Sequence, residues 1–168
     1  MLKRIQRTQG RQRRASVAVV AILFCSALSH EFAASAADEP GGAVAQRSEQ
    51  QLGPTQEFDR RAAQAFQSKS LDDVRRLDAD LNSKFVEIEH HAASGGSACG
   101  CDVAIAALRI IVGYALNKLD GQGRYQTWMQ DESIQLVKKF HDYLTDCAID
   151  AGRSTINLQL EPDHVKAL

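Results

Sequence analysis

The sequence predicts an all-α protein, a small antiparallel four-helix bundle-like domain with a disordered N-terminal leader and an extended C-terminal tail. Three observations predict this class. Apolar residues recur at helical spacing over most of the chain, only three of the 168 residues are prolines, and runs of β-branched residues are few. The length favours one domain of modest size over a multidomain enzyme.

Residues 1–36 have the three parts of a secretory signal peptide. Residues 1–14 carry six cationic side chains and no acidic one, an uncharged and largely apolar stretch spans 15–28, and small residues follow at 34–36 for cleavage. We therefore expect a periplasmic or secreted protein. An uncleaved signal anchor is the alternative, although the apolar stretch is short for a membrane span. Cys25 lies inside that stretch, and we expect no lipid attachment to it.

Cleavage after residue 36 would make the protein acidic. The remaining chain has 14 Lys and Arg against 20 Asp and Glu side chains, a net charge of −6. A negative surface repels nucleic acid, so we expect no DNA or RNA partner. No continuous apolar run reaches the roughly 18 residues of a spanning helix, so we also expect no membrane span after cleavage.

Residues 37–53 are rich in Ala, Gly, Gln and Glu and lack apolar periodicity, which predicts a disordered linker. The helical domain is expected over 54–152. Its first helix is short, covering about 55–67, and Pro54 suits the first turn of such a helix. Its apolar face is thin, so we expect it to dock against something larger.

A second helix is predicted from residue 71 onward. Ser70 is a suitable N-cap, and the acidic residues after it are favoured by the helix dipole. Ser94 and the glycines that follow it end the helix. One apolar stripe runs along it at steps of three and four residues, formed by Val74, Leu77, Leu81, Phe85 and Ile88.

Residues 101–119 are apolar on almost every side, and such a helix must be surrounded by others. We expect it at the centre of the domain, with a homodimer interface through it as the alternative. A fourth helix is predicted over 125–151, closed by Gly152, and the short connection makes these two helices antiparallel. Apolar residues alternate with polar ones in 153–168, which predicts an extended tail lying on the bundle. A segment offered to a partner's sheet is the alternative.

The cysteines give the most specific structural prediction. Cys101 lies 21 residues before the middle of the turn, near Gln122, and Cys147 lies 25 residues after it. At about 1.5 Å per residue, both are about 30 Å from the turn, at the same end of the helix pair. Exported proteins keep disulfides. We therefore predict a Cys101–Cys147 disulfide, with Cys99 as the alternative partner of Cys147.

Cys99 and Cys101, preceded by His90 and His91, form a candidate metal site. Thiolates and imidazoles suit copper(I) or zinc, and a thiol beside a disulfide can exchange with it. The pattern lacks the second ligand pair of a zinc motif, and histidines at a helix end are commonly solvated. We therefore expect a structural disulfide and no cofactor, with metal binding or thiol redox chemistry as the alternative function.

Recognisable enzyme motifs are absent from the sequence. It contains no G-x-S-x-G elbow, no phosphate-binding loop, no H-E-x-x-H helix and no G-x-G-x-x-G turn after a strand, so we expect no catalytic residues. By elimination, the sequence predicts a small exported factor that binds another envelope or secreted protein. Stress or chaperone-like factors, inhibitors and immunity proteins belong to this class, and the residues do not select among them.

Overall fold

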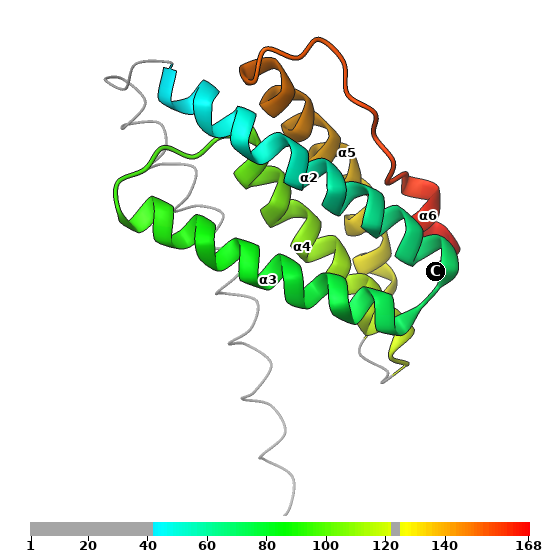
Figure 1. The fold of residues 1–168 in the computed structure, drawn as a ribbon. Helices are drawn as coiled ribbons and strands as arrows, with labels where there is room; N and C mark the ends of the chain where they lie inside the picture. The colour runs from blue at the N-terminus through cyan, green and yellow to red at the C-terminus, as the bar shows by residue number, and fades with distance from the viewer. Residues whose placement is uncertain (1–41, 122–124) are drawn as a thin grey trace, which may run out of the picture. The chain divides into compact units, whose positions relative to one another are not determined.

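The structure, a computed structural model, describes residues 42–121 and 125–168. Within them, four long helices and one short helix follow in order: α2 (Gly42–Ser68), α3 (Leu71–Ala93), α4 (Gly100–Leu119), α5 (Thr127–Asp150) and α6 (Pro162–Ala167). The long helices run alternately in opposite directions and pack side by side (Figure 1). The predicted all-α, antiparallel class is therefore confirmed. The predicted signal peptide over 1–36, with Cys25, lies outside the described residues.

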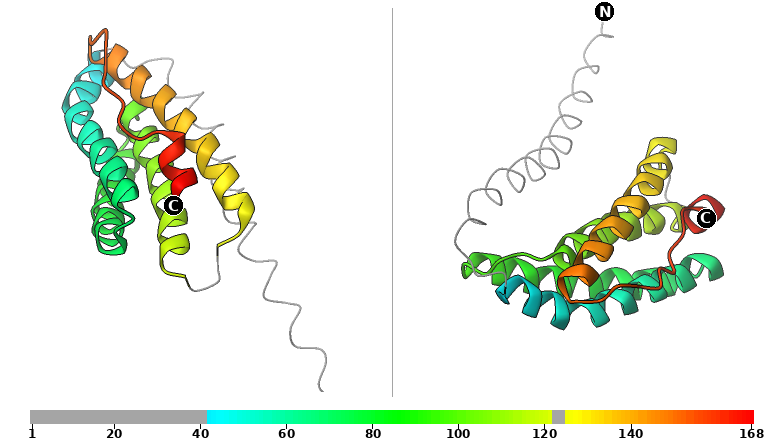
Figure 2. Two further views of the ribbon diagram at one scale, coloured as in Figure 1. Left: turned by 90° about the vertical axis from the view of Figure 1, so that its right-hand side faces the viewer. Right: turned by 90° about the horizontal axis from the view of Figure 1, so that it is seen from above.

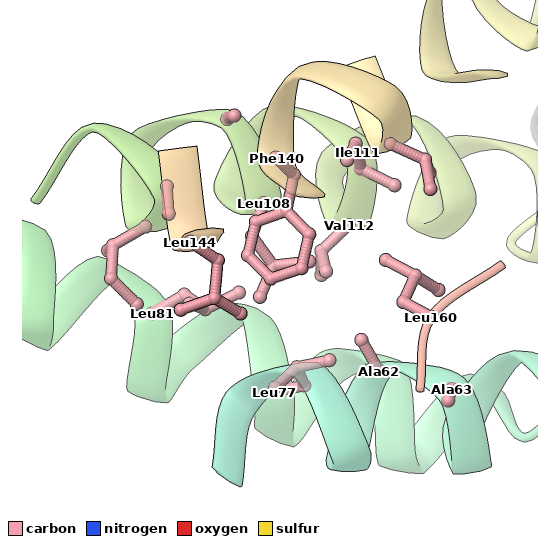
Figure 3. Packing of buried hydrophobic residues seen from close by; sticks show 14 of the residues in the cluster. Ala62, Ala63, Leu77, Leu81, Leu108, Ile111, Val112, Phe140, Leu144 and Leu160 are labelled. Atoms are coloured by element: carbon pink, nitrogen blue, oxygen red, sulfur yellow. The ribbon is translucent and has the colours of Figure 1, made fainter. Parts of the chain in front are cut away.

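The core lies between the four long helices and also receives one residue from the C-terminal tail. Phe140 sits in its middle beside Leu108 and Leu144, and Leu160 of the tail closes one side (Figure 3). Each of these side chains is completely buried. Burying an apolar side chain of this size contributes about 1.5–3 kcal/mol, so the core accounts for much of the driving force for folding. Of the five residues predicted to form the apolar stripe of α3, Val74, Leu77 and Leu81 are buried in the core. Ile88 is partly buried against the core, and Phe85 is partly exposed and lies outside it.

Local signals set the helix ends as expected. The Ser70 side chain accepts a hydrogen bond from the Asp73 backbone N–H at 3.2 Å, which caps α3. Gly121 and Gly152 follow the ends of α4 and α5 with φ of 64° and 71°. Glycine adopts this left-handed conformation without strain, which makes it the usual residue after a helix end.

The predicted disordered linker over 37–53 is wrong from residue 42 onward, because α2 begins at Gly42 and continues through Pro54. Its first half buries one side against the domain, but the inward positions are mostly polar, so no hydrophobic periodicity is visible. These positions are Ser48, Leu52, Thr55 and Asp59. Pro54 is exposed, and it lies inside the helix rather than in its first turn. Residues 37–41 lie outside the described part.

The helix α4 contacts α2, α3 and α5, which confirms its predicted central place. Its burial is one-sided, however. Val103 and Ile110 are 40% and 42% exposed, so the expectation that this helix is surrounded on every side is wrong. The helix α4 is also long and apolar enough to cross a membrane. The core helices of soluble proteins meet the same two criteria.

The C-terminal tail is extended only in part. Residues 153–161 run back along the bundle without regular structure, and α6 then packs against α5 and α2 (Figure 2). The expectation of an extended tail over 153–168 is therefore wrong at 162–167, where Pro162 begins a helix. Leu160 is completely buried in the chain's own core, so it is not offered to a partner's sheet.

Candidate functional site

A disulfide joins Cys101, in the first turn of α4, to Cys147, near the end of α5. The two Cα atoms are 5.2 Å apart, and the residues are separated by 46 positions in the sequence. Both side chains are completely buried. This is the pairing that the sequence favoured, because the antiparallel arrangement brings both cysteines to the same end of the helix pair.

The backbones of α4 and α5 approach closely beside the disulfide because residue 100 is a glycine. A Cβ atom at Gly100 would lie 2.7 Å from the Tyr143 carbonyl oxygen and 2.8 Å from the Cys147 backbone nitrogen. Both are backbone atoms, which cannot rotate away. Any other residue would therefore push the two helices apart at the disulfide, a requirement that the sequence analysis did not find.

A buried ion pair supports the same end of α4. Arg47 donates two hydrogen bonds to the carboxylate of Asp102, from Nε to Oδ2 at 2.6 Å and from Nη2 to Oδ1 at 2.9 Å. The side chains of Arg47 and Asp102 are only 14% and 3% exposed. Asp102 also accepts a hydrogen bond from the Cys99 backbone N–H at 3.1 Å, which satisfies a donor that the helix start leaves free. Sequence reasoning missed this pair because Arg47 falls in the expected linker.

Cys99 is the free cysteine of the described residues, and it is buried next to the disulfide. Its Sγ donates to Asp102 Oδ2 at 3.5 Å. Burial raises the pKa of the Cys99 thiol, and the Asp102 carboxylate raises it further. Because the thiolate is the nucleophile in disulfide exchange, this thiol is held in its less reactive form.

The three sulfur atoms of Cys99, Cys101 and Cys147 all lie within 4.8 Å of one another. We call these residues the sulfur cluster. Ser48 of α2 adjoins it: its carbonyl oxygen is 3.7 Å from Cys147 Sγ. A weak hydrogen bond from the Ser48 side chain lowers the pKa of the Cys99 thiol, by less than burial raises it. Yet Ser48 Oγ is buried and has no hydrogen-bond partner of good geometry.

The histidines expected near the cysteines do not join the cluster. The His91 Nε2 atom lies 3.2 Å from the Ser97 carbonyl oxygen, and its ring lies against Gly96. His90 is exposed. In the described residues, the group of side chains close enough to share a metal ion consists of the three sulfurs alone. The candidate set of Cys99, Cys101, His90 and His91 is therefore corrected, with Cys147 in place of the histidines.

A second feature is the outer face of α4, defined here as Val103, Ala106, Ile110 and Gly113. Steps of three and four residues place these positions on one side of the helix. Val103 and Ile110 are two of the five exposed large apolar residues in the described part of the chain, and the space around the Cβ position of Gly113 is open. Contiguous exposed apolar residues are typical of surfaces that bind another protein.

Comparison with known proteins assigns no family to this chain. No protein-family model, no curated protein and no solved structure matches it. Its function must therefore be argued from the sulfur cluster and from the outer face of α4.

Proposed function

We propose that this protein is a small, exported, non-catalytic binding factor that recognises another protein through the outer face of α4. The observation that carries the proposal is the exposure of Val103 and Ile110 on a helix whose opposite side forms the core. Removing such apolar side chains from water favours association. The signal-like leader supports export. The missing enzyme motifs support a role in binding rather than in catalysis.

The shape of this face selects an apolar helix as the partner. Ala106 and Gly113 have little or no side chain, so a partner can approach the backbone of α4 there. Val103 and Ile110 project as ridges, and ridges on one helix pack into the gaps of another. The best partner therefore has large side chains opposite Ala106 and Gly113. It has small side chains opposite Val103 and Ile110.

A second copy of the chain meets this requirement when the two α4 helices run antiparallel. A pairing centred at Leu108 places Val103 opposite Gly113, and Ala106 opposite Ile110. Each large side chain then faces a small one, and the contact is identical from either copy, as a two-fold interface requires. We therefore assign a second copy to this face as its first partner.

The test is the substitution Ile110→Asp. Sedimentation velocity should give a dimer for the wild type and a monomer for the variant, because an interface does not tolerate two unpaired carboxylates. The matched control is Ile149→Asp on α5, since Ile149 is even more exposed, at 63%, but lies outside this face. Far-UV circular dichroism should show that both variants remain folded.

The same two variants decide whether the partner is a different exported protein. If the wild type is a monomer, affinity capture from the envelope or secreted fraction should recover a partner that Ile110→Asp loses and Ile149→Asp keeps. That result would keep the proposed binding role but identify the partner as a different exported protein rather than a second copy of this chain. A monomer without any association that depends on Ile110 would overturn the proposal.

A further inference from the structure

We propose that reduction of the Cys101–Cys147 disulfide turns the sulfur cluster into a zinc site, with three thiolates as ligands and Ser48 Oγ at the fourth position. The spacing of the sulfurs is the first argument. Zinc–thiolate bonds of about 2.3 Å in a tetrahedral site put the sulfurs about 3.8 Å apart. The three sulfur atoms already lie within 4.8 Å of one another, so each separation from Cys99 has to shrink by no more than about 1 Å. The sulfurs of Cys101 and Cys147, which are bonded to each other in the disulfide, have to move apart to the same spacing after reduction.

Ser48 supplies the second, independent argument. Its hydroxyl oxygen is completely buried and has no hydrogen-bond partner of good geometry, only a weaker interaction with the Cys99 thiol, whereas buried polar atoms in folded proteins nearly always have a partner. In the disulfide-bonded state the Cys99 thiol satisfies this atom only weakly. A cation held by the three sulfurs would satisfy it, since zinc accepts oxygen as well as sulfur ligands.

Charge favours zinc over copper(I) at this position. Three thiolates with Zn²⁺ leave one net negative charge, whereas three thiolates with Cu⁺ leave two, and burying uncompensated charge is costly. The first turn of α4 partly compensates the remaining charge, because Cys99 and Cys101 lie at the positive end of the helix dipole. Arg47 pairs with the adjacent Asp102 carboxylate, which nevertheless opposes the Cys99 thiolate, so the positive charge of the zinc ion has to offset this repulsion as well.

Formation of the site needs a reductant, and its class is a dithiol. The dithiol transfers two electrons and two protons to the Cys101–Cys147 bond, which becomes two thiols, while the dithiol becomes its own disulfide. Zn²⁺ then displaces one proton from each thiol of the cluster. The oxidised protein retains only the Cys99 thiol, so binding is expected from the reduced protein alone.

The experiment titrates the reduced full-length protein, freed of reductant without oxygen, with Zn²⁺ against a chromophoric chelator, and separately with Co²⁺. We expect one ion per chain, three protons released, and thiolate-to-cobalt charge-transfer absorption. Loss of a group that only supports a metal ligand lowers affinity about 10–100-fold. Cys99→Ser should therefore weaken binding by at least about 100-fold, and Ser48→Ala by about tenfold. The control His91→Ala should bind like the wild type.

Equal zinc affinity of the wild type and Cys99→Ser would overturn the proposal, as would loss of binding in His91→Ala or one-to-one binding by the oxidised protein. Binding of Cu⁺ without Zn²⁺ would also overturn it. If the reduced apo chain is unfolded, circular dichroism keeps the test decisive. Zn²⁺ should then restore helicity in the wild type but not in Cys99→Ser, and failure to do so would contradict the proposal.

Discussion

Two fastenings hold this domain together in different ways. At one end of the bundle, a covalent bond between Cys101 and Cys147 joins α4 to α5. Along its side, two polar groups hold the tail, and we call them the tail latch. Asp59 of α2 accepts the backbone N–H groups of Gln159 and Leu160 at 2.6 and 2.9 Å. The Nε2 atom of His141 on α5 lies 2.6 Å from the Leu160 carbonyl oxygen.

The two fastenings stabilise the protein through different states of the chain. In the chain-entropy model, a disulfide acts mainly on the unfolded state, because it removes conformations that the open chain would otherwise sample. The latch acts on the folded state, where it satisfies backbone groups that would otherwise be buried without partners. Reduction should therefore affect the disulfide and leave the tail latch in place. A change of pH should affect the tail latch, which contains titratable side chains.

The largest expected effect is that of the double substitution Cys101→Ser/Cys147→Ser. Opening a loop of 46 residues should lower the free energy of unfolding by about 4 kcal/mol in the chain-entropy model. Urea denaturation of the oxidised proteins measures this difference. Cys99→Ser is the control, because it leaves the disulfide in place. A loss no greater than that of the control would show that the bond does not constrain the unfolded chain.

The next largest effect is expected from Arg47→Met, which tests the polar support of the disulfide end. This substitution leaves the buried Asp102 carboxylate without its cation, and breaking a buried ion pair costs about 3–5 kcal/mol. We expect about 3 kcal/mol, since Arg47 keeps some contact with solvent. Arg61→Met is the matched control, because the Arg61–Asp80 pair is largely exposed and such pairs contribute about 0–1 kcal/mol. Similar losses in both variants would contradict this account.

Asp59→Ala should have a smaller effect, concentrated in the tail. It leaves two backbone N–H groups without an acceptor, which costs about 1–3 kcal/mol. Hydrogen exchange should show faster exchange at the amides of Gln159 and Leu160, with the disulfide intact. The control is Asp163→Ala in α6, because Asp163 is exposed and pairs with Lys166, and it lies far along the chain from Asp59, the acceptor of the Gln159 and Leu160 amides. Unchanged protection of the two tail amides would mean that the latch does not hold the tail.

The smallest expected effect is a pH dependence that also arises at Asp59. Burial raises the pKa of this carboxyl group, although the hydrogen bonds from Gln159 and Leu160 partly oppose the shift. With a raised pKa, the folded state binds more protons than the unfolded chain, so stability falls as pH rises from the ordinary value through the raised one. The stability of the wild type relative to Asp59→Asn should therefore decrease across this window in urea denaturation. An increase would show that the hydrogen bonds outweigh the burial.

Sequence reasoning succeeded where structure depends on local or countable signals. Ser70 and Gly152 marked helix ends, and apolar spacing located α3 and α4. The disulfide followed from chain lengths alone, because two antiparallel helices carry their cysteines to one end. The helix ends and apolar stripes depend on residue type and spacing within a short stretch, and the disulfide depends on the number of residues between each cysteine and the turn.

The remaining features depend on contacts between distant segments. Ser48, Thr55 and Asp59 face the interior, but as polar residues they gave α2 no apolar stripe, so its first half was taken for a linker. Arg47 and Asp102 are 55 positions apart, and no local pattern connects them. The Ser48 hydroxyl could not be assigned to the sulfur cluster for the same reason.

The missing side chain at Gly100 also limits which mutations the protein can accept. Every substitution there adds a Cβ atom that meets backbone, whereas at Gly53 and Gly113 the same atom would enter open space. In a saturation scan, position 100 should therefore tolerate no replacement, while position 53 should tolerate many. Substitutions at position 113 should leave folding unchanged and weaken only the association with a partner. One data set would then separate selection for folding from selection for binding.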